Sequence, residues 1–186
     1  MSYKVAINGF GRIGRNFLRT AYRNSAIEIV AVNDVTDTRT LAHLLKYDST
    51  FGTLPESVEH GDGFIQLAGR RIRATAIKNP AELPHKDMGI DIALECTGIF
   101  TSKEKASAHL TAGAKRVIVS APADGADYTV VYGVNHQGLT KDHVVISNAS
   151  CTTNCLAPVA KVLHDAIGID HGMMTTIHSY TGDQPT

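Results

Sequence analysis

A glycine-rich turn near the N-terminus constrains the fold of this chain more than any other feature. Residues 9–14 read Gly-Phe-Gly-Arg-Ile-Gly, directly after the short apolar run Tyr3 to Asn8. Beyond the turn, Phe17, Leu18 and Tyr22 recur at helical spacing. The pattern predicts a strand, a tight turn and a helix, which is the arrangement that holds the pyrophosphate of a dinucleotide.

Each residue of this turn has a physical reason to be there. Gly9 permits the tight turn, Gly11 lets the backbone approach the pyrophosphate, and Gly14 permits close packing of the helix on the strand. The positive end of the helix dipole attracts phosphate, and Arg12 and Ile13 would supply backbone N–H groups there. We therefore expect these five residues to form the cofactor-binding turn.

An acidic residue strengthens this interpretation. Asp34 lies twenty positions after Gly14, at the end of a second strand predicted over residues 27–32. A carboxylate there can accept both ribose hydroxyls of NAD and would repel the extra phosphate of NADP. The sequence predicts NAD as the cofactor. A glycine-rich turn that binds no ligand is the alternative.

The first 149 residues continue the alternation of strand and helix. A second helix is marked by Leu41, Leu44 and Leu45, and a hairpin insertion is predicted around Ala68-Gly69-Arg70. The later predicted elements are strands over residues 90–95, 117–119, 128–132 and 144–146 and a helix over residues 102–112. This order predicts an α/β class with a doubly wound, mostly parallel Rossmann sheet over residues 1–149.

A cysteine follows that predicted sheet. Cys151 falls in the first turn of a helix predicted over residues 148–167, with Asn148 or Ser150 as its N-cap. The unpaired N–H groups and the helix dipole favour the thiolate, so Cys151 is a candidate nucleophile. The candidate base is His178, at the end of an apolar strand predicted over residues 173–177. A small buried apolar residue is the alternative reading of Cys151.

The other thiols and imidazoles carry weaker signals. Cys155 lies one helical turn beyond Cys151, which suggests a metal or a disulfide. Structural zinc usually takes four ligands, and a reducing compartment disfavours the disulfide, so a packed thiol is the better interpretation. Cys96 is expected to line the core or the cofactor pocket. The remaining histidines are predicted to lie at the surface or to have their ring nitrogens paired in hydrogen bonds. They are His43, His60, His85, His109, His136, His143, His164 and His171.

Composition narrows the classes of partner. Lys+Arg and Asp+Glu are both 18, and no run of like charges suggests a surface for nucleic acid or membrane. No apolar stretch approaches the roughly 20 residues that span a bilayer. The start of the chain leads into a strand without a signal-peptide pattern, so we expect a cytoplasmic location. A small molecule is the expected partner.

Two motifs together resemble a known family. The segments Lys4 to Arg15 and Ser150 to Cys155 are very similar to those of the phosphorylating glyceraldehyde-3-phosphate dehydrogenases. Further family-like blocks are residues 45–49, 95–100, 119–122, 132–135 and 178–184. The resemblance covers the whole chain and corresponds to the N-terminal half of family members, which run well beyond Thr186. It implies that residues 150–186 begin an α+β catalytic domain with an antiparallel sheet, in which Cys151 is the nucleophile and His178 its base.

The resemblance also implies the ligand contacts. Ser150, Thr152 and Thr181 would contact the phosphates of the substrate or inorganic phosphate, together with Cys151. The implied NAD contacts are Arg12, Ile13, Asp34, Lys78, Thr97, Phe100 and Ser120. Lys78 stands where other members often have arginine, so we expect a change in binding on the adenine side.

The activity implied is the oxidation of glyceraldehyde 3-phosphate to 1,3-bisphosphoglycerate, with NAD and inorganic phosphate, through a thioester on Cys151. This is a reaction of glycolysis and gluconeogenesis, and the family implies a homotetramer. Erythrose-4-phosphate dehydrogenase shares most of the motifs, whereas aspartate-semialdehyde dehydrogenase fits poorly. A fragment that binds NAD without catalysis is a further alternative.

Overall fold

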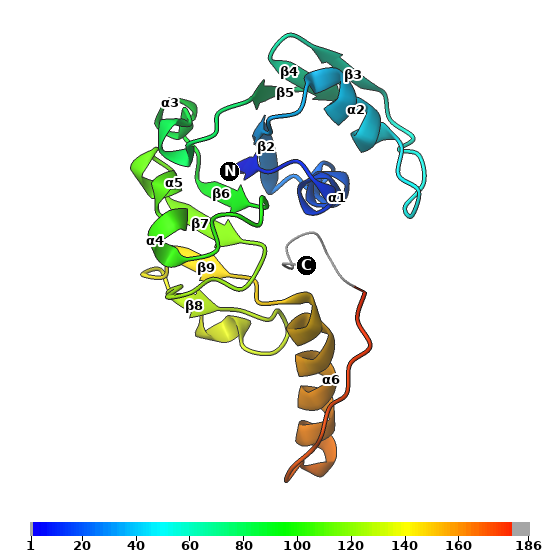
Figure 1. Cartoon of the computed structure of the whole chain (residues 1–186), viewed down its shortest axis with the longest axis vertical. Helices are drawn as coiled ribbons and strands as arrows, with labels where there is room; N and C mark the ends of the chain where they lie inside the picture. The colour runs from blue at the N-terminus through cyan, green and yellow to red at the C-terminus, as the bar shows by residue number, and fades with distance from the viewer. Residues whose placement is uncertain (1, 180–186) are drawn as a thin grey trace.

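The computed structural model describes residues 2–179 and has a sheet with helices on both faces, followed by one long helix (Figure 1). The helices are α1 (Arg12–Ala21), α2 (Thr38–Lys46), η1 (Pro80–Glu82), α3 (His85–Met88), α4 (Lys103–Ala106), α5 (Ala108–Thr111), η2 (His136–Gly138) and α6 (Cys151–Ile167). The strands are β1 (Tyr3–Asn8), β2 (Ile27–Asn33), β3 (Val58–Gly61), β4 (Phe64–Leu67), β5 (Arg70–Thr75), β6 (Ile92–Glu95), β7 (Arg116–Val119), β8 (Tyr128–Thr129) and β9 (Val145–Ser147).

The sheet confirms the predicted doubly wound α/β fold. Within the described residues its strand order is β3-β4-β5-β2-β1-β6-β7-β9-β8. The strands from β5 to β8 along that order pair in parallel, whereas β3, β4 and β5 form an antiparallel meander. The chain moves outward from β1 first to one side and then to the other. The carboxyl end of β1 is therefore the point where the winding direction reverses.

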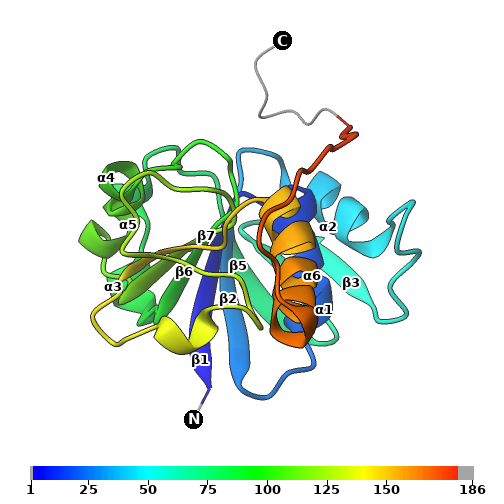
Figure 2. The same cartoon turned by 90° about the horizontal axis from the view of Figure 1, so that it is seen from below.

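Alternating side chains of the strands build a core on each face of the sheet. In β1, Val5 and Ile7 join the cluster that includes Leu18 of α1 and Leu45 of α2, whereas Ala6 packs with the opposite face. This is the alternation that a strand buried on both sides requires. Figure 2 shows α1 and α2 on one side of the sheet and α3, α4 and α5 on the other.

Local signals account for the helix starts. The Asp37 carboxylate accepts a hydrogen bond from the Thr40 backbone N–H at 2.9 Å and caps α2. The Ser150 hydroxyl accepts one from the Thr153 N–H at 3.0 Å and caps α6. Of the two caps predicted for the last helix, Ser150 is the one used. Both contacts satisfy N–H groups that a helix leaves unpaired.

The structure corrects several predicted elements. The helix predicted over residues 102–112 is divided into α4 and α5 at Ser107. The strand predicted over residues 128–132 shortens to Tyr128–Thr129, and β3 was not predicted. The strand predicted over residues 173–177, which would begin an antiparallel sheet, is wrong for this structure: residues 171–179 carry no regular element. A strand needs a neighbour to pair with, and the described chain provides none there.

Among residues 2–179, no helix is both long and apolar enough to cross a membrane.

Candidate active site and cofactor pocket

A pocket opens at the carboxyl edge of the sheet, where the winding direction reverses. β1 pairs in parallel with β2 on one side and with β6 on the other, so the ends of all three strands meet there. The pocket has a volume of about 530 Å³. It is lined by Asn8, Gly9, Gly11, Asn33, Asp34, Val35, Ile77, Lys78, Cys96, Thr97, Ile99 and Phe100. Open α/β sheets bind ligands in this position.

The three glycines of the turn have different roles. A Cβ on Gly14 would lie 2.3 Å from the Gly9 carbonyl oxygen, and one on Gly9 would lie 2.7 Å from the backbone N of Thr97. Both glycines are therefore required by packing, and Gly9 also has a positive φ of 87°. A Cβ on Gly11 would meet nothing within 4 Å. Gly11 leaves open space in which a pyrophosphate can approach the backbone, so the turn fits a dinucleotide.

The carboxylate of Asp34 joins the turn to the end of β2. One of its oxygens accepts a hydrogen bond from the Phe10 N–H at 2.8 Å, and the other accepts one from the Thr36 N–H at 3.0 Å. Each carboxylate oxygen can accept a second hydrogen bond. Asp34 is thus held at the pocket wall with capacity left for ribose hydroxyls.

The predicted cofactor residues fall into two groups. Those that line the pocket are Gly9, Gly11, Asp34, Lys78, Thr97 and Phe100. Arg12 and Ile13 lie in the exposed first turn of α1, and the Arg12 guanidinium is 3.3 Å from the Asp48 carboxylate. Gly14 is buried against β1, and Ser120 follows β7. The cofactor contacts of both groups stay predictions.

The predicted nucleophile and base, 27 positions apart in the chain, lie together. The Sγ atom of Cys151 is 3.3 Å from Nε2 of His178. The carbonyl oxygen of Ser179 can only accept, so Nδ1 of His178 donates to it, and this contact fixes which ring nitrogen faces the thiol. The hydrogen bond with His178 lowers the pKa of Cys151, and the backbone N–H of Thr152 acts in the same direction. The arrangement is that of an activated thiol nucleophile.

The residues around Cys151 present hydroxyl groups and a helix N-terminus. Cys151 is the first residue of α6. Oγ of Ser150 lies 2.9 Å from the Thr152 hydroxyl and 2.7 Å from that of Thr153. Ala149 has a φ of 58°, an unusual value for a residue with a side chain, and it turns the chain between β9 and α6. Thr181 lies outside the described residues.

The thiol and the pocket lie at the same edge of the sheet. β9 pairs in parallel with β7, and β7 with β6, so the end of β9 points the same way as the end of β1. Cys151 follows the last residue of β9 by four positions. Parallel pairing alone therefore brings the reactive thiol to the edge that carries the dinucleotide pocket.

The other two cysteines are free thiols, as is Cys151. Burial raises the pKa of Cys96 to about 12, and a hydrogen bond with Ser120 opposes that shift. Cys96 is thus an unreactive thiol in the pocket wall, as expected. Cys155 is exposed within the described residues, so the packed environment predicted for it is absent there.

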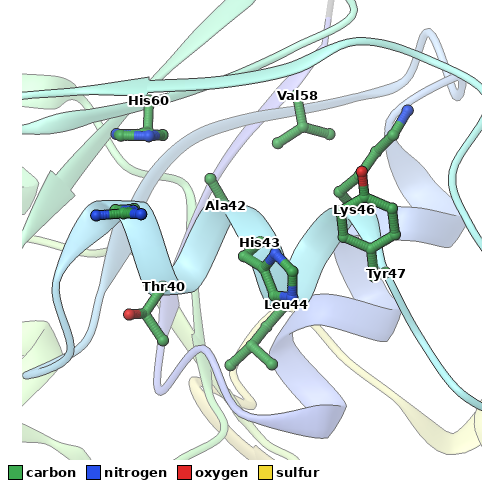
Figure 3. A pocket seen from close by; sticks show the side chains of 9 residues that line it. Thr40, Ala42, His43, Leu44, Lys46, Tyr47, Val58 and His60 are labelled. Carbon is green, nitrogen blue, oxygen red and sulfur yellow. The ribbon is translucent and has the colours of Figure 1, made fainter.

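A second hollow lies between α2 and β3, with a volume of about 490 Å³ (Figure 3). The rings of His43 and Tyr47 lie beside each other in it, with centroids 4.9 Å apart. The Lys46 ammonium group donates to the carbonyl oxygens of Leu54 and Glu56 at 2.7 and 2.8 Å, so backbone groups already use this cation. None of the predicted site residues lines this hollow, and we assign no function to it.

Sequence reasoning missed the polar residues beneath the cofactor pocket. Asn8, Asn33 and Glu95 each end a strand, and His109 lies in α5; all four are buried and hydrogen-bonded to one another. The sequence pattern that could have predicted these residues is a polar residue at the last position of each apolar strand. Both ring nitrogens of His109 have hydrogen-bond partners, which is one of the two environments expected for it.

Fold and site together define a class. A doubly wound sheet with this glycine turn and an acid at the end of the second strand is a dinucleotide-binding domain, here with a cysteine–histidine pair at the same edge.

Comparison with known proteins identifies the family. Residues 3–103 match the NAD binding domain of glyceraldehyde 3-phosphate dehydrogenase, and residues 150–186 match its C-terminal domain. The chain belongs to this family. Enzymes named glyceraldehyde-3-phosphate dehydrogenase from Xanthobacter flavus and Cereibacter sphaeroides are 65% and 64% identical to it over 100% of the chain. One from Pseudomonas aeruginosa is 57% identical over 99% of the chain. The chain spans 56% of the length of each of these relatives.

Proposed function

We propose that this chain belongs to a phosphorylating aldehyde dehydrogenase that converts glyceraldehyde 3-phosphate to 1,3-bisphosphoglycerate with NAD and inorganic phosphate. The observation that carries the proposal is the 3.3 Å contact between Sγ of Cys151 and Nε2 of His178. This contact lies at the edge of a sheet that also carries an NAD-type pocket. The names of the relatives support the same activity.

Cys151 and His178 divide the chemistry between them. His178 takes the proton of the Cys151 thiol, and the resulting thiolate attacks the aldehyde carbon. The imidazolium returns this proton to the new alkoxide, which gives a hemithioacetal, and His178 accepts it again as that carbon is oxidised. NAD, held by the glycine turn and Asp34, would supply the hydride acceptor for that carbon, and the product of the oxidation would be a thioester on Cys151. Inorganic phosphate then attacks the thioester carbon, the acyl phosphate departs, and Cys151 is again a thiolate.

The start of α6 is suited to the charges that develop. The backbone N–H of Cys151 lies in the first turn of the helix, where the helix dipole stabilises a tetrahedral oxyanion. Ser150 and Thr152 offer hydroxyl groups beside the thiol for the phosphate groups, and we assign Thr181 to the same set from the family resemblance. The positions of Ser150 and Thr152, on either side of Cys151 in the chain, support this role.

Asp34 supports the choice of NAD. Its carboxylate keeps hydrogen-bonding capacity for both ribose hydroxyls and would repel a 2′-phosphate. Lys78 lines the same pocket, and we assign it to the adenine side of the cofactor from the family resemblance. The NAD-binding domain matched by residues 3–103 agrees with this assignment.

We further propose a domain boundary between residues 149 and 150. The C-terminal domain match begins at residue 150, which supports it. A nucleophilic thiol works in its reduced form, and this favours a cytoplasmic location. We infer a homotetramer from the family resemblance; chromatographic sizing with light scattering would test it.

The decisive experiment measures NADH formation by the full-length protein. Glyceraldehyde 3-phosphate, NAD and phosphate are supplied, with and without prior alkylation by iodoacetamide. We expect phosphate-dependent NADH formation that alkylation abolishes. Faster turnover of erythrose 4-phosphate would instead identify the four-carbon substrate, and NAD binding without any turnover would show that the protein has lost catalysis.

A further inference from the structure

A buried carboxylate lies behind the cofactor pocket and takes no part in the proposed chemistry. Glu95, the last residue of β6, is 1% exposed. One of its oxygens accepts hydrogen bonds from the backbone N–H of Thr97, at 2.7 Å, and from the Thr97 hydroxyl. The other oxygen contacts Nδ2 of Asn8 at 2.6 Å and Nε2 of His109 at 2.9 Å. Both oxygens thus have two partners each, which is the capacity of a carboxylate.

The contacts of His109 assign its proton. A carboxylate oxygen that already accepts from Asn8 can only accept from a ring nitrogen, so Nε2 of His109 is the donor to the carboxylate form of Glu95. The other ring nitrogen, Nδ1, lies 3.0 Å from Nε2 of His85. Burial, and then the neighbouring His109, lowers the pKa of His85 to about 4, so His85 is neutral near pH 7. The histidine pair therefore holds a donor on Glu95, and neither histidine lines the pocket.

On the pocket side, the same network continues across the strand ends. Oδ1 of Asn8 accepts a hydrogen bond from Nδ2 of Asn33 at 2.7 Å. Asn33 in turn exchanges two hydrogen bonds with the backbone of Ile77, at 2.8 and 2.9 Å. Asn8, Asn33, Ile77 and Thr97 all line the cofactor pocket. The network thus holds the pocket wall from β6 across β1 and β2 to the segment after β5.

We propose that Glu95 and His109 are positioning residues of the cofactor site. They do not line the pocket, and they act through Thr97 and Asn8, whose polar groups they hold at its wall. The proposal rests on the proposed function, because it assumes that NAD occupies this pocket. A pocket wall held in one geometry before binding spares the ligand the cost of ordering it.

The chain offers a matched pair of variants at His109. His109→Gln retains an N–H donor for Glu95, whereas His109→Leu removes it and leaves a buried acceptor short of a partner. Glu95→Gln replaces two accepting oxygens by one and removes the acceptor from either Thr97 or Asn8. Asp91→Asn is the control, because Asp91 contacts Lys4 and Lys115 at the opposite edge of the sheet.

The test uses the full-length protein, first shown to bind NAD and to form NADH. The dissociation constant for NAD is measured by calorimetry, together with kcat at saturating NAD and the melting temperature. We expect His109→Leu and Glu95→Gln to raise the dissociation constant about tenfold, the factor that corresponds to one lost buried hydrogen bond. We expect kcat to change less than twofold, and His109→Gln and Asp91→Asn to bind NAD within twofold of the parent protein.

Two outcomes would overturn the proposal. One is an unchanged NAD affinity in His109→Leu and Glu95→Gln, with only a lower melting temperature, since the network would then be structural alone. The other is an equal loss of affinity in His109→Gln and His109→Leu. If His109→Leu does not fold, Glu95→Gln carries the test alone and must show the tenfold loss of affinity with kcat retained. Failure of the proposed function itself would be evident earlier, as absence of NAD binding by the parent protein.

Discussion

The sheet domain and the α6 region differ in how they are stabilised. Leu45 of α2 and Ile65 of β4 are completely buried, whereas Leu163 and Ile167 of α6 are 46% and 80% exposed. α6 has no buried residue, and it extends away from the sheet (Figure 1). The helix that begins at the proposed nucleophile, Cys151, therefore contributes little to the core of the described chain. The buried core and the proposed nucleophile lie in different regions of this molecule.

The exposed apolar face of α6 lies in the part of the chain that matches the C-terminal domain of the family. Its apolar positions recur at helical spacing, as in a helix that packs against a core. Residues 150–186 match the family's C-terminal domain, and the chain spans about half the length of the relatives. The exposed apolar face of α6 is thus confined to the region that matches the C-terminal domain.

The largest expected effect separates chemistry from stability at one residue. Cys151→Ser removes the thiolate nucleophile, and we expect NADH formation by the full-length protein to fall by a factor on the order of 10⁴ or more. NAD affinity and the melting temperature should not change, because Cys151 is exposed and lies outside the core. Cys155→Ser is the control and should retain most of the activity. Turnover by Cys151→Ser within tenfold of the parent rate would refute the assignment.

A pair of leucine truncations tests the difference in stability directly. Leu45→Ala should lower the free energy of unfolding of this chain by about 2–5 kcal/mol, because it opens a cavity in the core. Leu163→Ala should lower it by less than about 0.5 kcal/mol, as expected for a site away from the core. Urea unfolding of both variants provides the measurement. Equal losses would mean that α6 packs on the sheet in solution.

Gly11 and Gly14 of the cofactor turn allow stability and NAD binding to be compared within the sheet domain. Gly14→Ala would place a Cβ 2.3 Å from the Gly9 carbonyl oxygen, so we expect about 1–3 kcal/mol of destabilisation. Gly11→Ala meets no neighbouring atom within 4 Å and should leave stability nearly unchanged while weakening NAD binding. Thermal unfolding and NAD titration of the two variants distinguish these effects. A stable Gly14→Ala variant with normal affinity would contradict the packing argument.

The smallest expected effect concerns the acidity of the thiol. The hydrogen bond between Cys151 and His178 lowers the pKa of Cys151, so in the parent protein the thiolate persists to lower pH than an ordinary cysteine would allow. His178→Asn removes that contact, and the pKa should rise. The rate of iodoacetamide alkylation follows the thiolate fraction, so its pH profile should move to higher pH. His171→Asn, whose recorded partner is the neighbouring Asp170, should leave the profile in place.

Local sequence patterns predicted those parts of the site that depend on residues close together in the chain. The turn from Gly9 to Gly14, the acid at Asp34 and a helix cap at Asn148 or Ser150 depend on nearby residues. The structure has each of them where the pattern indicates. The strand predicted over residues 173–177 was wrong because β-structure depends on a partner strand, which the described residues do not provide there.

What the sequence by itself determined here is the order of elements, the cofactor turn and the cysteine at a helix start. Dihedral preferences, helix capping and apolar periodicity act over a few residues and can be read along the chain. Only the tertiary structure decided that His109 supports Glu95 behind the pocket and that His178 reaches Cys151 at 3.3 Å. Such contacts join residues 14 and 27 positions apart, and they exist only after packing has brought different elements together.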